Sequence, residues 1–177
     1  MKRGVSELKL QPIDPKTLTT DILNVFDYQK ALLTAGNKEK VNTMTIGWAQ
    51  LGTVWGAPIC TVYVRPERYT YQFMEDNEYF TVSVLPVEHK KTTMVYCGTK
   101  SGRDVDKLKE CELTVGYGVG DAPYIEDAEW VLVCKKVYAQ DLTADHILDD
   151  DLISPYYGAK GNWHKMYMGR VVEAYKK

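Results

Sequence analysis

The sequence has no apolar run that approaches the roughly 20 residues of a membrane-spanning helix. It also has no Cys-x-x-Cys pair, and its four cysteines are too widely spaced for a compact disulfide scaffold: Cys60, Cys97, Cys111 and Cys134. The N-terminal stretch Met-Lys-Arg-Gly-Val-Ser lacks the apolar core of a signal peptide. From these absences we expect a protein of the reducing cytoplasm with no membrane partner.

Charge of one sign is also scarce, because 22 Lys and Arg face 24 Asp and Glu for a formal net charge of −2. Such a chain has no overall positive field to attract nucleic acid, so any recognition of an anion must be local. The three histidines, His89, His146 and His164, lack metal-ligand spacing, and a Cys/His metal site assembled in space is the less favoured alternative. No serine triad is evident. We expect no metal and, for any enzymatic activity, a cofactor.

The residues that are present suit one folded domain over residues 1–177, since 45% are hydrophobic and 26% are charged. Near-alternating β-branched and aromatic residues predict strands. These strands cover residues 29–35, 41–48, 58–64, 79–85 and 165–175, with 125–142 as one long strand or two joined by a bulge. Gly36 and Asn37 tolerate positive φ and predict a hairpin between the first two strands. The patterns indicate a mostly antiparallel sheet closed into a small β-barrel.

The third of these strands runs into Val64-Arg-Pro-Glu-Arg-Tyr-Thr-Tyr71, a stretch typical of an anion site. Pro66 pushes the residue before it into an extended conformation and predicts a helix that begins at the proline and ends near residue 76. Unpaired N–H groups at the helix start could meet a phosphate. The side chains that could join them are Arg65, Arg68 and Thr70. The alternative is an ordinary surface helix whose arginines pair with nearby glutamates.

A second cationic segment follows a predicted helix over residues 88–97, which a glycine ends. Ser101 with Asp104 forms a capping-box pattern ahead of apolar residues and predicts another helix start. Lys100 and Arg103 place positive charge at that start. A capping box alone says little, but beside the first arginine cluster this segment could form a second wall of one phosphate site.

Two further segments are interpreted as loops. The glycine-rich run at residues 116–121 lacks the spacing of a dinucleotide fingerprint, and Pro123 stands where the helix of that motif should begin. Residues 145–151 lack the glycine and the alternation of a calcium-binding loop, so we expect a solvated turn. Gly169, in the last predicted strand, marks a bend or a close approach of a neighbouring segment.

Four motifs, taken together and in order, resemble the flavin reductase-like family of FMN-binding split barrels, and within it the flavoredoxin-type branch. They are Asn42-Thr-Met-Thr-Ile-Gly-Trp48, Val64-Arg-Pro-Glu-Arg-Tyr-Thr70, Cys97-Gly-Thr-Lys-Ser-Gly-Arg-Asp104, and His164 five residues before Gly169-Arg-Val-Val. The resemblance runs from about residue 28 to 174. It implies a mainly β fold, a six-stranded antiparallel Greek-key split β-barrel with short peripheral α-helices. It also implies a homodimer with non-covalent FMN near the subunit interface.

The resemblance further implies a set of cofactor contacts. The strand that borders the flavin ring and ribityl chain supplies Thr43, Met44, Thr45 and Trp48. The phosphate side is held by Arg65, Arg68, Tyr69 and Thr70, with Lys100, Ser101 and Arg103 from the second loop. His164 would contact the ring or a substrate, although Trp163 stands where many relatives have an acidic residue. From the residues alone, Met44 and Trp48 would simply be core, which is the usual case for such residues.

The function implied is an NAD(P)H-dependent flavin reductase, in which hydride passes from the nicotinamide to flavin N5. The alternative is a non-enzymatic flavoredoxin-like electron carrier that retains FMN and exchanges electrons with a redox partner protein. A more distant alternative is a barrel that binds another anion or a nucleic acid through its arginine and lysine clusters, against which the acidic balance argues.

Overall fold

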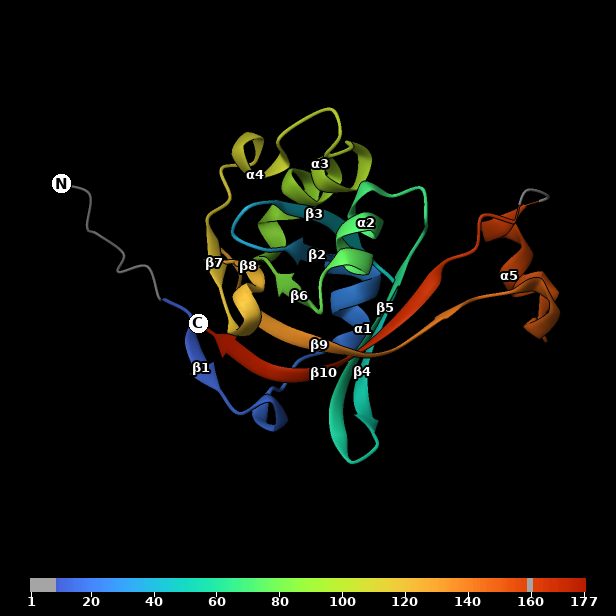
Figure 1. The fold of residues 1–177 in the computed structure, drawn as a ribbon, viewed down its shortest axis with the longest axis horizontal. Coiled ribbons are helices and arrows are strands. Elements are labelled where there is room, and N and C mark those ends of the chain that lie inside the picture. Colours follow the sequence, from blue (N-terminus) through green and yellow to red (C-terminus); the bar gives the residue numbers. More distant parts are fainter. Residues whose placement is uncertain (1–8, 159–160) are drawn as a thin grey trace.

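The computed structural model describes residues 9–158 and 161–177, so the N-terminal stretch discussed above lies outside the described part. Its main feature is an eight-stranded antiparallel sheet that curls into a barrel (Figure 1). Along the sheet the strands follow the order β3-β2-β6-β9-β10-β5-β4, and β1 joins the side of β10. Their bounds are β1 Gln11–Ile13, β2 Ala31–Gly36, β3 Val41–Ile46, β4 Ala49–Val54, β5 Ala57–Val64, β6 Tyr79–Val84, β9 Trp130–Asp141 and β10 Lys165–Lys176. A separate hairpin pairs β7 Val115–Tyr117 with β8 Pro123–Ile125.

The mainly β, antiparallel architecture predicted from the sequence is confirmed. The six predicted strands correspond to β2, β3, β5, β6, β9 and β10, and the hairpin of β2 with β3 turns at Gly36, whose φ is +133°. β1, β4 and β7 were missed, because β1 has three residues, β4 contains Gly52, and β7 lies partly in the glycine-rich run at 116–121 that was interpreted as a loop. The predicted strand at 125–142 is β9 alone, since a turn at residues 126–129 separates it from β8.

Two apolar clusters hold the sheet. The cluster inside the barrel takes alternate residues of the strands, such as Leu33, Val82 and Leu132, and adds Phe73 and Met74 from a helix that closes one end. The second cluster lies on the outer face, where the neighbouring residue Leu32 packs beneath the small hairpin and the helices beside it. Strand periodicity therefore divides successive side chains between two cores.

Gly169 is the point at which β10 crosses the barrel core. A Cβ atom there would lie 2.6 Å from Cε1 of Phe80 and 2.7 Å from Cβ of Cys134. The pairing of β10 with β9 also shifts register between Met168 and Gly169. The predicted close approach at this glycine is confirmed.

The helices differ most from the sequence-based expectations. α2 spans Tyr69–Asp76 and so begins three residues after Pro66, because residues 66–68 form a turn first. The helix expected at 88–97 is a 3₁₀ turn, η3 Val87–Lys91, followed by α3 Thr93–Thr99, which continues through Gly98. The capping-box prediction was wrong: α4 spans Lys107–Glu110, and its cap is Asp106, whose Oδ1 accepts from the N–H of Lys109 at 3.1 Å.

The remaining short elements are η1 Pro15–Thr17, α1 Ile22–Asn24, η2 Val25–Gln29, η4 Val119–Asp121, η5 Ala144–His146 and α5 Asp150–Tyr157. β9 and β10 carry η5 and α5 away from the barrel body, so that α5 stands at the far end of the molecule (Figure 1). We call the segment between the two strands, residues 142–158 and 161–164, the arm. The solvated turn predicted at 145–151 is correct only in its first part, since its last residues begin α5.

Within residues 9–158 and 161–177, no helix is both long and apolar enough to cross a membrane. The same residues contain no group of three His, Cys, Asp or Glu side chains placed to hold a metal ion.

Candidate functional site

A polar cavity of about 270 Å³ lies where the start of α2 meets the loop between α3 and α4. We call it the anion pocket. Seven residues predicted from the sequence as cofactor contacts line it: Met44, Arg68, Tyr69, Thr70, Lys100, Ser101 and Arg103. Glu67, Cys97, Thr99 and Lys107 complete the lining.

The turn after β5 builds the first wall. Pro66 ends the strand, and the Arg68 N–H then bonds the carbonyl of Arg65 at 3.0 Å. Arg68 itself is extended and occupies the N-cap position of α2. This conformation sends its guanidinium across the pocket, where Nη1 donates to the Gly98 carbonyl at 3.4 Å. The arginine therefore joins the two walls.

The second wall is the loop after α3, which packs tightly on the first. Ser101 Oγ accepts from the N–H of Arg103, which turns the chain. A Cβ atom on Gly102 would lie only 2.0 Å from Oδ1 of Asn42, so only glycine fits there. The amide of Asn42 in turn donates to Thr70 Oγ1 at 2.7 Å. Asn42 thus ties both walls to β3, a role that its sequence motif did not suggest.

Arg103 and Tyr69 complete the contact between the walls. Nη1 of Arg103 donates to the Glu67 carbonyl at 3.2 Å, and its guanidinium carbon lies 4.9 Å from the centre of the Tyr69 ring. This cation–π contact keeps the positive charge of Arg103 at the pocket.

Lys107 is the functional residue that the sequence analysis missed. It is only 6% exposed, and its ammonium donates to the Thr43 carbonyl at 3.0 Å and to the Cys97 carbonyl at 2.9 Å. Burial lowers the pKa of Lys107, and the charge of Arg68 lowers it further. No sequence signal marks it, because it looks like any lysine in the first turn of a charged helix.

The charge balance of the anion pocket is strongly positive. Among the described lining residues, four carry a positive charge, Arg68, Lys100, Arg103 and Lys107, and Glu67 carries the one carboxylate. A Glu67 carboxylate oxygen accepts from the side-chain amide of Asn162. Several donors around one small cavity suit a phosphate dianion, which needs charge-assisted bonds from more than one side. The residues present therefore fit the phosphate of a mononucleotide cofactor.

Two predicted contacts on β3 have other partners. Thr43 is fully buried, and its Oγ1 lies 3.0 Å from Oγ1 of Thr34. Thr45 Oγ1 donates to the Met94 carbonyl at 2.7 Å and so docks α3 on the strand. Neither side chain lines the anion pocket, and their contacts with a cofactor stay a prediction.

Arg65, Trp48 and His164 gather instead at the arm. Nη2 of Arg65 donates to the Tyr156 carbonyl at 2.7 Å, and its guanidinium lies over the ring of Tyr157. The centres of the Trp48 and His164 rings are 4.6 Å apart. The structure thus divides the predicted residues between a cationic pocket and an aromatic region next to the arm.

The environment of His164 keeps its imidazole neutral. Burial lowers the pKa of His164 to about 4, and the nearby charges of Arg65 and Arg68 act in the same direction. Its Nδ1 lies 2.9 Å from the hydroxyl of Tyr157. Burial also raises the pKa of Tyr157, so both partners of this hydrogen bond are uncharged at neutral pH.

The thiol of Cys97 is not a reactive nucleophile. Its Sγ lies 4.0 Å from Sγ of Cys111. Burial and that neighbour raise the pKa of Cys97 to about 12, so almost no thiolate exists at neutral pH. Cys97 therefore contributes packing to the pocket.

Residues 24–177 match the model of the family described as flavin reductase like domain. A search of curated proteins finds no significant match.

Among solved structures, flavoredoxin from Methanosarcina acetivorans is 25% identical with a TM-score of 0.67, and the match covers 93% of this chain and 76% of that one. An FMN-binding domain of a flavin reductases-like enzyme from Shewanella baltica is 17% identical with a TM-score of 0.66, covering 94% and 76%. An NADH:FAD oxidoreductase from Streptomyces globisporus, in complex with NAD and FAD fragments, is 18% identical with a TM-score of 0.62, covering 86% and 78%.

These likenesses agree with the split-barrel fold described above. The family model spans most of the chain, including both walls of the anion pocket and the arm. The protein therefore belongs to the flavin reductase-like domain family.

Proposed function

We propose that the protein binds FMN without covalent attachment and acts as an NAD(P)H-dependent flavin reductase. The observation that carries the proposal is the anion pocket, where four cationic side chains face one carboxylate in a chain of this family. A net charge of −2 over the whole molecule makes this local excess of positive charge specific rather than general.

In this proposal the side chains of the protein would bind FMN and orient its ring. Arg68, Arg103 and Lys107 would hold the phosphate, while Trp48 and His164 would border the ring. Bound FMN would supply the chemistry, because it can accept a hydride at N5 and release electrons to an acceptor. Neutral His164 can hydrogen-bond a ring atom or a substrate, and no side chain is required to act as a base.

The test is a titration of the FMN-free protein with FMN, followed by quenching of flavin fluorescence. We expect saturable binding near one FMN per chain, and the absence of binding would overturn the proposal. Anaerobic addition of NADH or NADPH to the loaded protein then tests the reductase activity. A loaded protein that neither nucleotide reduces would instead be an electron carrier with a redox partner protein.

We also propose a homodimer located in the cytoplasm. Large aromatic side chains on the barrel surface support the dimer: Trp55 at the tip of the β4–β5 hairpin is 68% exposed and lies beside Tyr138 of β9, with ring centres 6.5 Å apart. The four free cysteines support a reducing compartment.

A further inference from the structure

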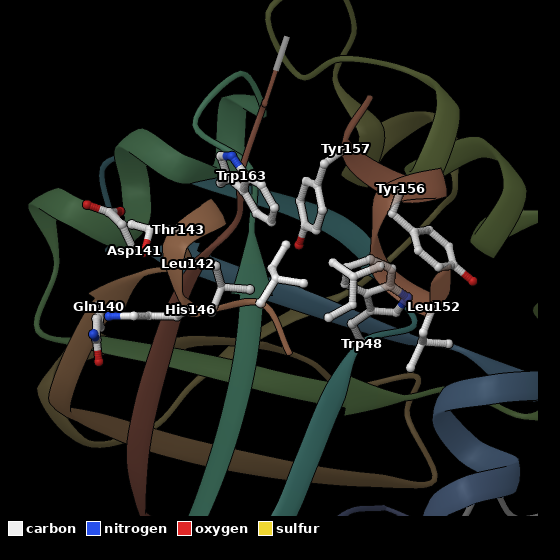
Figure 2. Close-up of a pocket in the computed structure, with 12 residues that line it drawn as sticks. Trp48, Gln140, Asp141, Leu142, Thr143, His146, Leu152, Tyr156, Tyr157 and Trp163 are labelled. Atoms are coloured by element: carbon white, nitrogen blue, oxygen red, sulfur yellow. The ribbon is translucent and has the colours of Figure 1, made fainter. Parts of the chain in front are cut away.

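The arm encloses a second cavity, which shares no lining residue with the anion pocket. We call it the arm pocket. Its volume of about 490 Å³ is within the roughly 300–1,000 Å³ of small-molecule sites. Figure 2 shows Tyr157 and Trp163 together above Trp48 and Leu142 around this cavity.

The lining of the arm pocket is apolar and aromatic. Tyr157 and Trp163 stack with ring centres 4.0 Å apart, and Tyr156 meets Trp48 edge to face at 5.1 Å. Aliphatic side chains such as Leu142 line the cavity beside these rings, and a smaller number of polar side chains complete the lining. Rigid rings with aliphatic neighbours favour a flat apolar ligand, which they can contact on faces and edges.

The charge of the arm pocket excludes an anionic ligand. None of the described lining residues is Lys or Arg, Asp141 is the one carboxylate, and His146 is the one lining side chain that can take up a positive charge. The guanidinium of Arg65 does not line the cavity: it donates to the Tyr156 carbonyl and lies over the ring of Tyr157. A dinucleotide, with its pyrophosphate, would therefore find no counter-charge there.

The arrangement of rings also disfavours a quaternary ammonium group. An aromatic cage for a cation needs several ring faces directed at one point. Here the face of Tyr157 is covered by Trp163, and the planes of Tyr157 and Trp48 lie at 72° to one another. The ring faces around the arm pocket therefore do not converge on one point as they would in an aromatic cage.

We propose that the arm pocket binds an uncharged, planar aromatic compound of about two fused rings. Its use as an electron acceptor rests on the proposed function, because Trp48 forms a wall of the pocket and is also the predicted contact of the flavin ring. A two-ring quinone of this class would take up two electrons and two protons from bound reduced FMN and would leave as the hydroquinone, with the FMN left oxidised, so that atoms and electrons balance.

Calorimetric titration of the FMN-free full-length protein tests the binding step. The probe is 2-acetylnaphthalene, which does not react with thiols. Two comparators have the same ring system with opposite charges: 2-naphthoate and the trimethyl(2-naphthyl)ammonium ion. We expect saturable binding of the neutral probe near one per chain. Either ion should bind with an affinity lower by about tenfold or more. Equal or tighter binding of an ion, or no binding of the neutral probe, would overturn the proposal.

Two substitutions place the probe. Leu142→Trp fills the cavity while keeping the bond from its backbone N–H to the His164 carbonyl at 2.9 Å. It should weaken probe binding about tenfold or more. Leu148→Trp is the matched control, because Leu148 is on the same arm, is fully exposed and does not line the cavity. Leu152→Trp, from the opposite side of the cavity, serves as a second filling variant if Leu142→Trp unfolds. Unchanged binding in the filled variants would refute the assignment.

FMN titration separates this proposal from the proposed function. Both sites should be filled at once, so saturating FMN should not displace the probe, although the probe's affinity can change because Trp48 borders both ligands. Displacement of the probe by FMN would mean one site instead of two and would overturn the arm pocket. Binding of the probe in a protein that does not bind FMN would leave the arm pocket standing and refute the flavoprotein proposal.

Discussion

At the scale of single residues, the anion pocket shows how neighbours decide what a side chain does. Arg65 and Arg68 are three positions apart in one motif, yet Arg68 crosses the anion pocket to Gly98 while Arg65 bonds to Tyr156 on the arm. The two arginines are equivalent by type and differ only in the segment that each one faces. Their substitutions should therefore have different effects.

Arg68→Ala should weaken FMN binding by about tenfold to a hundredfold, since it removes one charge-assisted phosphate contact. Arg65→Ala is the matched control and should change FMN affinity much less. Fluorescence titration of both variants measures the difference, and circular dichroism checks that each remains folded. Equal losses in the two variants would show that Arg65 also reaches the phosphate.

Lys107→Met should lower affinity for FMN but not for riboflavin, which lacks the phosphate. The buried ammonium donates to two carbonyls, and none of the ion pairs within the described residues includes it, so a phosphate would supply the missing counter-charge. Lys109→Met, on the exposed side of the same helix, is the control. A parallel loss of affinity for both flavins would indicate that Lys107 only supports the local structure.

The lowered pKa of His164 predicts how the stability of the folded protein depends on pH. Its pKa is about 4 in the folded protein and near 6.5 when unfolded. Between these two pH values the unfolded chain takes up a proton that the folded chain does not. The stability that neutral His164 contributes is therefore fully present above about pH 6.5 and is lost as the pH falls toward 4. His164→Gln should flatten this part of the profile in urea unfolding at several pH values. An unchanged slope would contradict the assigned pKa.

At the scale of elements, close packing decides which glycines are required. Gly169 and Gly52 are both strand residues in the same sheet, on β10 and β4. A Cβ on Gly169 would meet Phe80 and Cys134 in the core, whereas a Cβ on Gly52 would have no heavy atom within 4 Å.

Gly169→Ala should therefore lower the free energy of unfolding by about 1–3 kcal/mol through overpacking. Gly52→Ala should leave it nearly unchanged. Urea unfolding of the two variants beside the parent protein makes the comparison. Equal stabilities for both variants would mean that β10 can move away from Phe80.

At the scale of the whole molecule, the barrel places the anion pocket and the arm pocket on different elements, and the proposed dimer would add a second copy. Sedimentation should give twice the 20.2 kDa of one chain. The thermal midpoint should rise with protein concentration and with added FMN, because the second subunit and FMN both bind the folded chain. A monomeric mass at micromolar concentration would refute the dimer.

The sequence by itself determined the β architecture and the identity of the cationic segments. Alternation placed six strands, Pro66 ended β5, and the motifs beginning at Val64 and Cys97 marked both walls of the anion pocket. These features depend on neighbours close along the chain, where periodicity and proline geometry act directly.

Only the tertiary structure decided which residues meet. Lys107 lines the anion pocket because carbonyls on β3 and α3 accept hydrogen bonds from its ammonium. Asn42 contacts both walls of that pocket, at Thr70 and at Gly102. The arm pocket needs Trp48 from one end of the sheet and Tyr157 from α5, which lie far apart in the sequence. Contacts of this kind depend on how the barrel closes, and no local pattern encodes them.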